Sequence, residues 1–108
     1  MEKTAENALK EFVRNGKARY GDKTERIILF GSYARKDHRN ESDIDVLVIW
    51  KGDEVAGWNS LEREAVRMLF KYGFVISLKI ISPVEQRTMK ELDFPFMKTV
   101  SEEGVVVG

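Results

Sequence analysis

The chain has 108 residues, enough for one domain with one hydrophobic core, and we expect that domain to span residues 1–108. Its 18 basic and 18 acidic residues balance, so the composition supplies no clustered basic surface of the kind that polynucleotide binding needs. With no cysteine and a single histidine, the sequence excludes disulfides, thiolate zinc sites, thiol catalysis and a metal site built from histidines.

Membrane segments are also missing from the sequence pattern. No stretch approaches the roughly 20 apolar residues that span a bilayer. The first ten residues, MEKTAENALK, are charged and periodic, with no apolar signal core. We therefore expect a cytoplasmic protein.

The N-terminal part predicts a helix followed by a buried strand. Apolar residues from Ala5 to Val13 recur at helical spacing, which predicts a helix over about residues 4–18. The run IILF at residues 27–30 is short and fully apolar, as is typical of a buried strand.

The stretch from Gly31 to Asp45 holds the candidate chemistry. Gly31 and Ser32 stand where a strand ends and a helix can begin, a place that offers backbone N–H groups and a hydroxyl to a phosphate. Asp43 and Asp45 open the next predicted strand, and both point to one face because strand side chains alternate. Two such carboxylates, together with waters and substrate phosphates, suit Mg²⁺. A plain turn followed by an exposed aspartate is the alternative, but aspartate is disfavoured in strands.

Two further residues lie in the basic connection between these motifs. Arg35 has a fixed donor fork that suits a triphosphate, although a solvated surface arginine is the alternative. His38 is predicted to be a surface loop residue rather than a general base.

The C-terminal half continues the alternation of helices and strands. A helix over residues 58–72 is predicted with Trp58 and Leu69 on its apolar face, and a strand is predicted over residues 74–81. Ser82 is a strong helix start, and a last short helix and an edge strand at residues 105–107 close the chain.

The aromatic residues of this half are expected mainly in the core. Phe94 and Phe96 stand in a break between the last two helices, where a partner surface is the alternative.

The paired central motif resembles a known family. Gly-Ser at 31–32, followed after ten residues by Asp-x-Asp at 43–45, resembles the nucleotidyltransferases of the DNA polymerase β superfamily. The strings GSYAR and SDIDVLV resemble the minimal nucleotidyltransferases of archaea and bacteria, and the ending PFMKTVSEEGVVV is similar to their closing helix and strand. The resemblance implies an α/β (α+β) fold with a small mixed sheet backed by helices. It also implies transfer of a nucleoside monophosphate, expected as AMP from ATP.

The resemblance also implies roles for individual residues. Asp43 and Asp45 would hold the catalytic and nucleotide-bound Mg²⁺ ions, and Gly31, Ser32 and Arg35 would contact the nucleotide. Because so short a chain shows no acceptor-binding part, the acceptor is expected on a partner protein or a small molecule. The resemblance points to a helical HEPN-type partner in a toxin–antitoxin pair, with a homodimer as the alternative.

The strand predicted over residues 74–81 departs from the family pattern. Active members carry a third acidic residue on a neighbouring strand, whereas the polar face of this strand offers Ser77 and Lys79. Ser77 is expected at the third-ligand position, and a neutral hydroxyl cannot act as a carboxylate base. Lys79 could fill the metal position with its own charge, or both side chains could simply face solvent. Two functions therefore stay open: an active nucleotidyltransferase, or a catalytically weakened nucleotide-binding antitoxin or interaction subunit.

Overall fold

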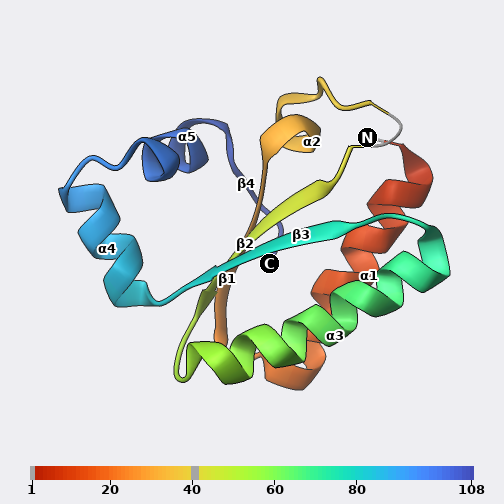
Figure 1. The fold of residues 1–108 in the computed structure, drawn as a ribbon, viewed down its shortest axis with the longest axis horizontal. Helices are drawn as coiled ribbons and strands as arrows, with labels where there is room; N and C mark the ends of the chain where they lie inside the picture. The colour runs from red at the N-terminus through yellow and green to blue at the C-terminus, as the bar shows by residue number, and fades with distance from the viewer. Residues whose placement is uncertain (1, 40–41) are drawn as a thin grey trace.

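A four-stranded mixed sheet with helices on both faces forms the framework of the molecule (Figure 1). The computed structural model describes residues 2–39 and 42–108, and the expected α/β fold is confirmed. No helix in this described part is long and apolar enough to cross a membrane. The elements are α1 (Lys3–Tyr20), β1 (Thr24–Phe30), α2 (Gly31–Arg35), β2 (Ile44–Trp50), α3 (Glu54–Tyr72), β3 (Ile76–Ile81), α4 (Pro83–Glu91), α5 (Pro95–Glu103) and β4 (Val105–Val106).

The sheet has the order β3-β2-β1-β4. Strand β2 pairs antiparallel with β1 and parallel with β3, and α3 makes the crossover that a parallel pair requires. Phe30 lies opposite Asp45, and Asp45 lies opposite Ser77. Because residues in register point to the same side of a sheet, all three side chains share one face.

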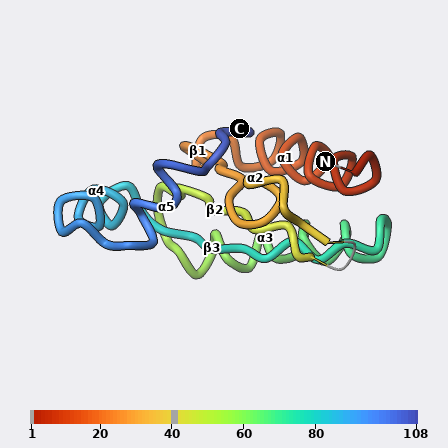
Figure 2. Tube along the Cα trace, turned by 90° about the horizontal axis from the view of Figure 1, so that it is seen from above, coloured from red at the N-terminus to blue at the C-terminus, as the bar shows by residue number. Residues whose placement is uncertain are grey.

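The two faces of the sheet carry separate apolar clusters. Helices α1 and α3 cover one face, and Figure 2 shows them along opposite margins of the molecule. On the other face, α5 packs against the strand residues whose side chains point away from α1 and α3. That second cluster consists of Ile28, Leu47, Ile49, Ile81, Met97 and Val100.

Strand β2 is covered on both faces, as its apolar sequence predicts. Every residue from Ile44 to Trp50 is buried except Asp45, which is half-buried. Asp45 is therefore the point at which this central strand reaches the surface.

Side-chain caps fix the starts of two helices. Ser82 accepts a hydrogen bond from the Glu85 backbone N–H at 3.0 Å, and the Glu85 carboxylate accepts one from the Ser82 N–H at 3.0 Å. This reciprocal capping box confirms the helix start predicted at Ser82. Asp53 caps α3 by accepting from the Val55 N–H at 3.0 Å. The helix predicted from residue 58 therefore begins four residues earlier, at Glu54.

The core prediction is wrong at three side chains. Trp58, Leu69 and Phe94 are 43%, 41% and 41% exposed. Helix α3 buries a narrower stripe, which includes Leu61 and Met68, because the sheet and α1 cover only part of its circumference. The strand predicted from residue 74 begins at Ile76.

Candidate active site

The candidate site begins where β1 ends. Gly31 has a left-handed φ of +73°, and a Cβ built at this position would overlap the Asp45 carboxylate. Only glycine combines this backbone conformation with so close an approach. Gly31 and the second aspartate, separated by thirteen residues of chain, are therefore in contact.

Asp45 has an electrostatic environment set by burial. Burial raises the pKa of its carboxyl, and the nearby charge of Asp43 raises it further, while Lys79 and Arg35 act in the opposite direction. Asp43 is exposed just before β2 and belongs to the same face by strand alternation. The two carboxylates thus lie close enough to repel each other and within electrostatic reach of two cations.

Strand β3 supplies the next part of this face. The parallel register sets Ser77 directly opposite Asp45, and Lys79 follows one alternation further along. Ser77 is therefore placed beside Asp45, where the resemblance expects a third carboxylate. Among the described residues, no group of three acidic or histidine side chains gathers as a metal cluster.

The residues present fit a cation that needs few protein ligands. Mg²⁺ is commonly held by one or two carboxylates, with waters and substrate phosphates in the remaining positions. Asp43 and Asp45 supply two carboxylates, and Gly31 lets the backbone lie directly against the Asp45 carboxylate. This donor set suits a metal that arrives with a nucleotide rather than a metal caged by protein.

An aromatic wall borders the same face, which the sequence reading missed. Phe96 of α5 meets Phe30 edge-on, with ring centroids 5.5 Å apart. The Lys79 ammonium lies 5.8 Å from the Phe96 ring centroid, within cation–π range. Phe30 is in register with Asp45, so the wall begins beside the carboxylate. The alternation of side chains along β1 and the Phe-Pro-Phe sequence at residues 94–96 were the available signals. A single sequence does not show that Phe30 and Phe96 are in contact.

Arg35 lies at the end of α2 and is already paired. Its Nε donates to Asp37 at 3.1 Å and its Nη1 donates to Glu103 at 3.5 Å, and these carboxylates raise the pKa of Arg35. Its charge also lowers the pKa of Asp45, which places it near the site. A nucleotide would have to compete with Asp37 and Glu103 for this guanidinium.

His38 is more enclosed than the sequence predicted. Its ring stacks on Tyr33, with centroids 4.1 Å apart and planes 16° from parallel. Tyr33 is 3% exposed, and burial raises the pKa of its phenol. The stack anchors the segment after α2 to the core, which gives His38 a positioning role in the fold.

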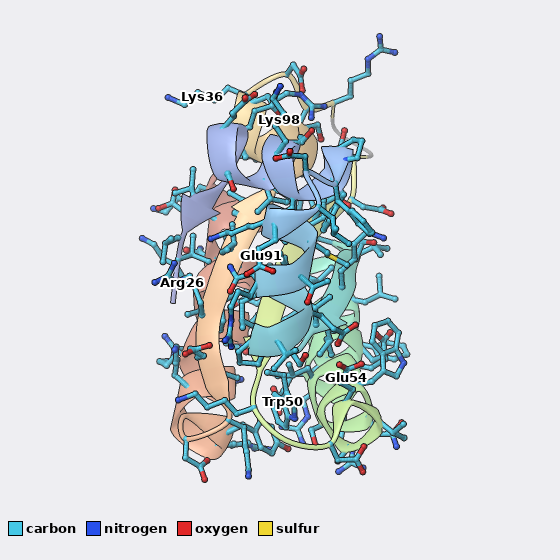
Figure 3. All side chains as sticks on the ribbon, turned by 90° about the vertical axis from the view of Figure 1, so that its left-hand side faces the viewer. Arg26, Lys36, Trp50, Glu54, Glu91 and Lys98 are labelled. Atoms are coloured by element: carbon cyan, nitrogen blue, oxygen red, sulfur yellow. The ribbon has the colours of Figure 1, made fainter. Side chains whose placement is uncertain are left out.

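Two basic side chains lie at the end of the molecule that holds α2. Figure 3 shows Lys36, at the end of α2, and Lys98 of α5 at the same end, with Trp50 and Glu54 toward the opposite end. The positive charges of Lys36 and Lys98 favour the approach of an anionic ligand to this end of the molecule.

A mixed sheet that presents two carboxylates beside a glycine-bearing strand end is an arrangement suited to a phosphate-bearing ligand with a divalent cation. Residues 6–107 match the family of the nucleotidyltransferase domain. The chain belongs to this family in its minimal form, and the expectation of a nucleotidyltransferase enzyme is confirmed.

Curated relatives cover nearly the whole chain. A Methanocaldococcus jannaschii protein named "Putative protein adenylyltransferase MJ0604" is 39% identical over 102 residues, which is 94% of this chain and 96% of the relative. A second protein of that organism, of the same description and numbered MJ0141, is 32% identical over 99 residues, or 92% and 94% of the two chains.

Solved structures show the same fold at lower identity. One, titled a toxin–antitoxin with AMP-PNP, superposes with a TM-score of 0.61 at 22% identity and covers 95% of this chain and 72% of that chain. A protein of Sulfolobus solfataricus superposes with a TM-score of 0.52 at 21% identity, covering 98% and 87%.

Proposed function

We propose that this nucleotidyltransferase moves AMP from ATP to an acceptor on a partner protein, in the presence of Mg²⁺. The two Methanocaldococcus jannaschii relatives carry the name of protein adenylyltransferases, which supports adenylyl transfer to protein. The structural relative with AMP-PNP supports an adenine nucleotide as the donor. ATP as donor is in keeping with work in the cytoplasm.

The contact between Gly31 and Asp45 is the observation that carries the proposal. A triphosphate lying along Gly31 and Ser32 would have its oxygens next to the Asp45 carboxylate. The two anions would repel each other there, and Asp43 and Asp45 would hold a cation whose charge offsets that repulsion. The geometry therefore links nucleotide binding to a divalent ion.

Each residue has a defined task in this proposal. The Ser32 hydroxyl donates to a β or γ phosphate oxygen, and Arg35 adds a charged contact to the triphosphate. Asp43 and Asp45 would hold Mg²⁺, which would supply charge neutralisation and alignment of the phosphoryl oxygens. An acceptor oxygen attacks the α phosphorus. The bond between the α phosphorus and the oxygen that bridges it to the β phosphorus breaks, and pyrophosphate leaves. The acceptor hydroxyl gives its proton to solvent or to a carboxylate.

The acceptor is proposed to lie on a helical partner of HEPN type. The structural relative is titled a toxin–antitoxin, which supports a pair of this kind. The partner would supply the acceptor and the surface that holds it, because the described domain consists of little more than the sheet and its covering helices.

A second function is favoured by one observation at the same place. Ser77 faces Asp45, where the resemblance implies a carboxylate in active members, and Lys79 lies on the same face. A hydroxyl is a weaker ligand for a hard cation than a carboxylate, so the site would keep nucleotide affinity and lose turnover. The chain would then act as a nucleotide-binding antitoxin or interaction subunit.

Label transfer separates the two functions. The protein is incubated with α-labelled ATP, Mg²⁺ or Mn²⁺ and a lysate of the source cell, and Asp45→Asn serves as control. We expect label on a protein band that the intact protein produces and Asp45→Asn does not, because the variant keeps the shape and loses the carboxylate charge. ATP binding without any transfer would contradict the enzyme and favour the binding subunit.

The same assay tests the Ser77 position. Restoring a carboxylate with Ser77→Asp should raise transfer at least about tenfold if the missing ligand limits turnover, since one good interaction in the transition state is worth that much. Ser77→Ala is the matched control, because it removes the hydroxyl without adding charge. Equal rates for all three proteins would show that position 77 does not limit the reaction.

A further inference from the structure

Helix α3 carries an apolar stripe that no other element of the described structure covers. The stripe consists of Val55, Trp58, Val66 and Leu69, with Phe70 beside it, and these side chains are between 40% and 86% exposed. Their spacing along the helix places the first four on one flank. Bulky apolar residues gathered in this way mark a surface that contacts another protein.

The opposite flank of α3 faces α1. Glu64 is ion-paired with Arg19 at 3.1 Å, and Lys71 is ion-paired with Glu11 at 2.7 Å. Trp58 and Leu69 lie on the other side of the buried stripe, away from these contacts with α1. Figure 2 shows that α3 and β3 share the margin of the molecule opposite α1. The apolar stripe of α3 therefore borders the free edge of β3.

Strand β3 is an unprotected edge of the sheet. It is six residues long, contains no proline, and pairs with β2 on one side only in the described sheet. Lys79 is its single charged residue. The other edge of the sheet, β4, is only two residues long. Long uncovered edges pair readily with another strand, and here the edge lies beside an apolar helix flank.

We propose that two copies of this chain associate along this margin. Strand β3 pairs antiparallel with β3 of the second copy, and the two α3 helices pack beside each other across the same two-fold axis. A two-fold interface requires a surface that complements itself, and a strand edge does so through its backbone groups. The two sheets then form one continuous sheet of eight strands.

The side chains of β3 select one register. A two-fold axis perpendicular to the sheet keeps each face of the sheet on its own side. Since Leu78 and Lys79 are the two central residues of β3, we expect the axis to pass beside one of them. With Lys79 on the axis, two ammonium groups would lie directly opposite each other, which is unfavourable. With Leu78 on the axis, Leu78 pairs with itself and Ser77 lies opposite Lys79 of the second copy. The second register is therefore expected.

Charges on α3 fit the same symmetry. Glu62 and Arg63 are adjacent near the middle of the stripe, and neither has an ion-pair partner in the described residues. Antiparallel helices bring Glu62 of each copy close to Arg63 of the other. The outer surface of α3 has a shallow, open hollow of about 650 Å³, lined by residues that include Trp58, Val66 and Phe70, where side chains of the second copy can lie.

This association brings a second copy to the candidate active site. Lys79 of the second copy lies opposite Ser77, which itself lies opposite Asp45. Each site thus gains a cation from the other chain, on one shared face of the sheet. The association stands whether or not the protein transfers nucleotide.

Light scattering coupled to gel filtration tests the surface over a range of protein concentrations. We expect a dimer, and we expect Val66→Glu to raise its dissociation constant at least about tenfold, because a charge enters the apolar centre of the interface. Val106→Glu is the matched control, since Val106 on β4 is also exposed, at 61%, but lies at the opposite edge of the sheet from β3. A monomer at every concentration, or equal effects of the two variants, would overturn the proposal.

The chain has no cysteine, so disulfide trapping can test the register. Mixing Ser77→Cys with Lys79→Cys under oxidation should give a crosslinked dimer, because these positions face each other across the axis. Ser77→Cys alone should not crosslink, because the two copies of residue 77 are then diagonal neighbours roughly 7–8 Å apart. Crosslinking of Lys79→Cys with itself, at a level equal to the mixture, would overturn the register.

Discussion

At the scale of the residue, Asp45 combines burial with a charge that the protein alone does not neutralise. Its pKa is raised first by burial and then by Asp43, which means that the folded protein favours the neutral carboxyl. Ionisation of this carboxyl at higher pH therefore costs folding stability in the absence of a cation. Such a conflict between stability and charge is typical of functional sites.

Asp45→Asn should therefore stabilise the protein when no divalent ion is present. A group with a raised pKa contributes stability below its unfolded pKa, near 4, and loses it as the pH rises through the folded value. We expect the variant to melt roughly 2–5 °C higher at pH 7, and the gain to shrink as the pH falls toward 4. Thermal unfolding followed by circular dichroism in EDTA measures this. A variant that melts below the wild type at pH 7 would contradict the role of burial.

At the scale of the element, local sequence predicted the helix starts and turns well. The capping box at Ser82 and Glu85 was visible in four residues of sequence, because both partners are local. The start of α3 was missed by four residues, because the capping role of Asp53 was not considered. Trp58 was misplaced because the helical period shows that a residue is near the apolar face but not how wide the covered stripe is.

Helix α4 should depend strongly on its cap, because it buries no residue completely. Ser82→Ala removes the acceptor for the Glu85 N–H and should lower the free energy of unfolding by about 1 kcal/mol. Urea denaturation measures the change. Ser101→Ala, at an exposed position of α5, is the control and should have little effect. Equal stabilities of Ser82→Ala and the wild type would contradict a stabilising role for the capping box.

At the scale of the whole molecule, the candidate site depends on contacts that sequence order hides. The two motifs at residues 31–32 and 43–45 could be predicted as one unit because an antiparallel pair brings the ends of adjacent strands together. The opposition of Ser77 to Asp45 needed the register of a parallel pair, which a single sequence leaves open. The wall of Phe30 and Phe96 needed the return of α5 over the sheet.

The margin of α3 and β3 also exists only at this scale. The helical stripe and the strand edge are each unremarkable in sequence, and they form one surface because α3 crosses over the sheet before β3. The exposure of Trp58 in the folded chain first showed that this surface is open.

The most direct test of the account is the affinity of the protein for ATP with and without the space at Gly31. Gly31→Ala would force its Cβ into the Asp45 carboxylate, and Gly73→Ala is a matched control, since Gly73 has a similar φ of +77° with no heavy atom near its added Cβ. Calorimetry with Mg²⁺ should show that Gly31→Ala weakens ATP binding at least about tenfold, or about 1.4 kcal/mol, while Gly73→Ala binds as the wild type does. A folded Gly31→Ala variant that binds ATP as well as the control would contradict a nucleotide site at Gly31 and Asp45.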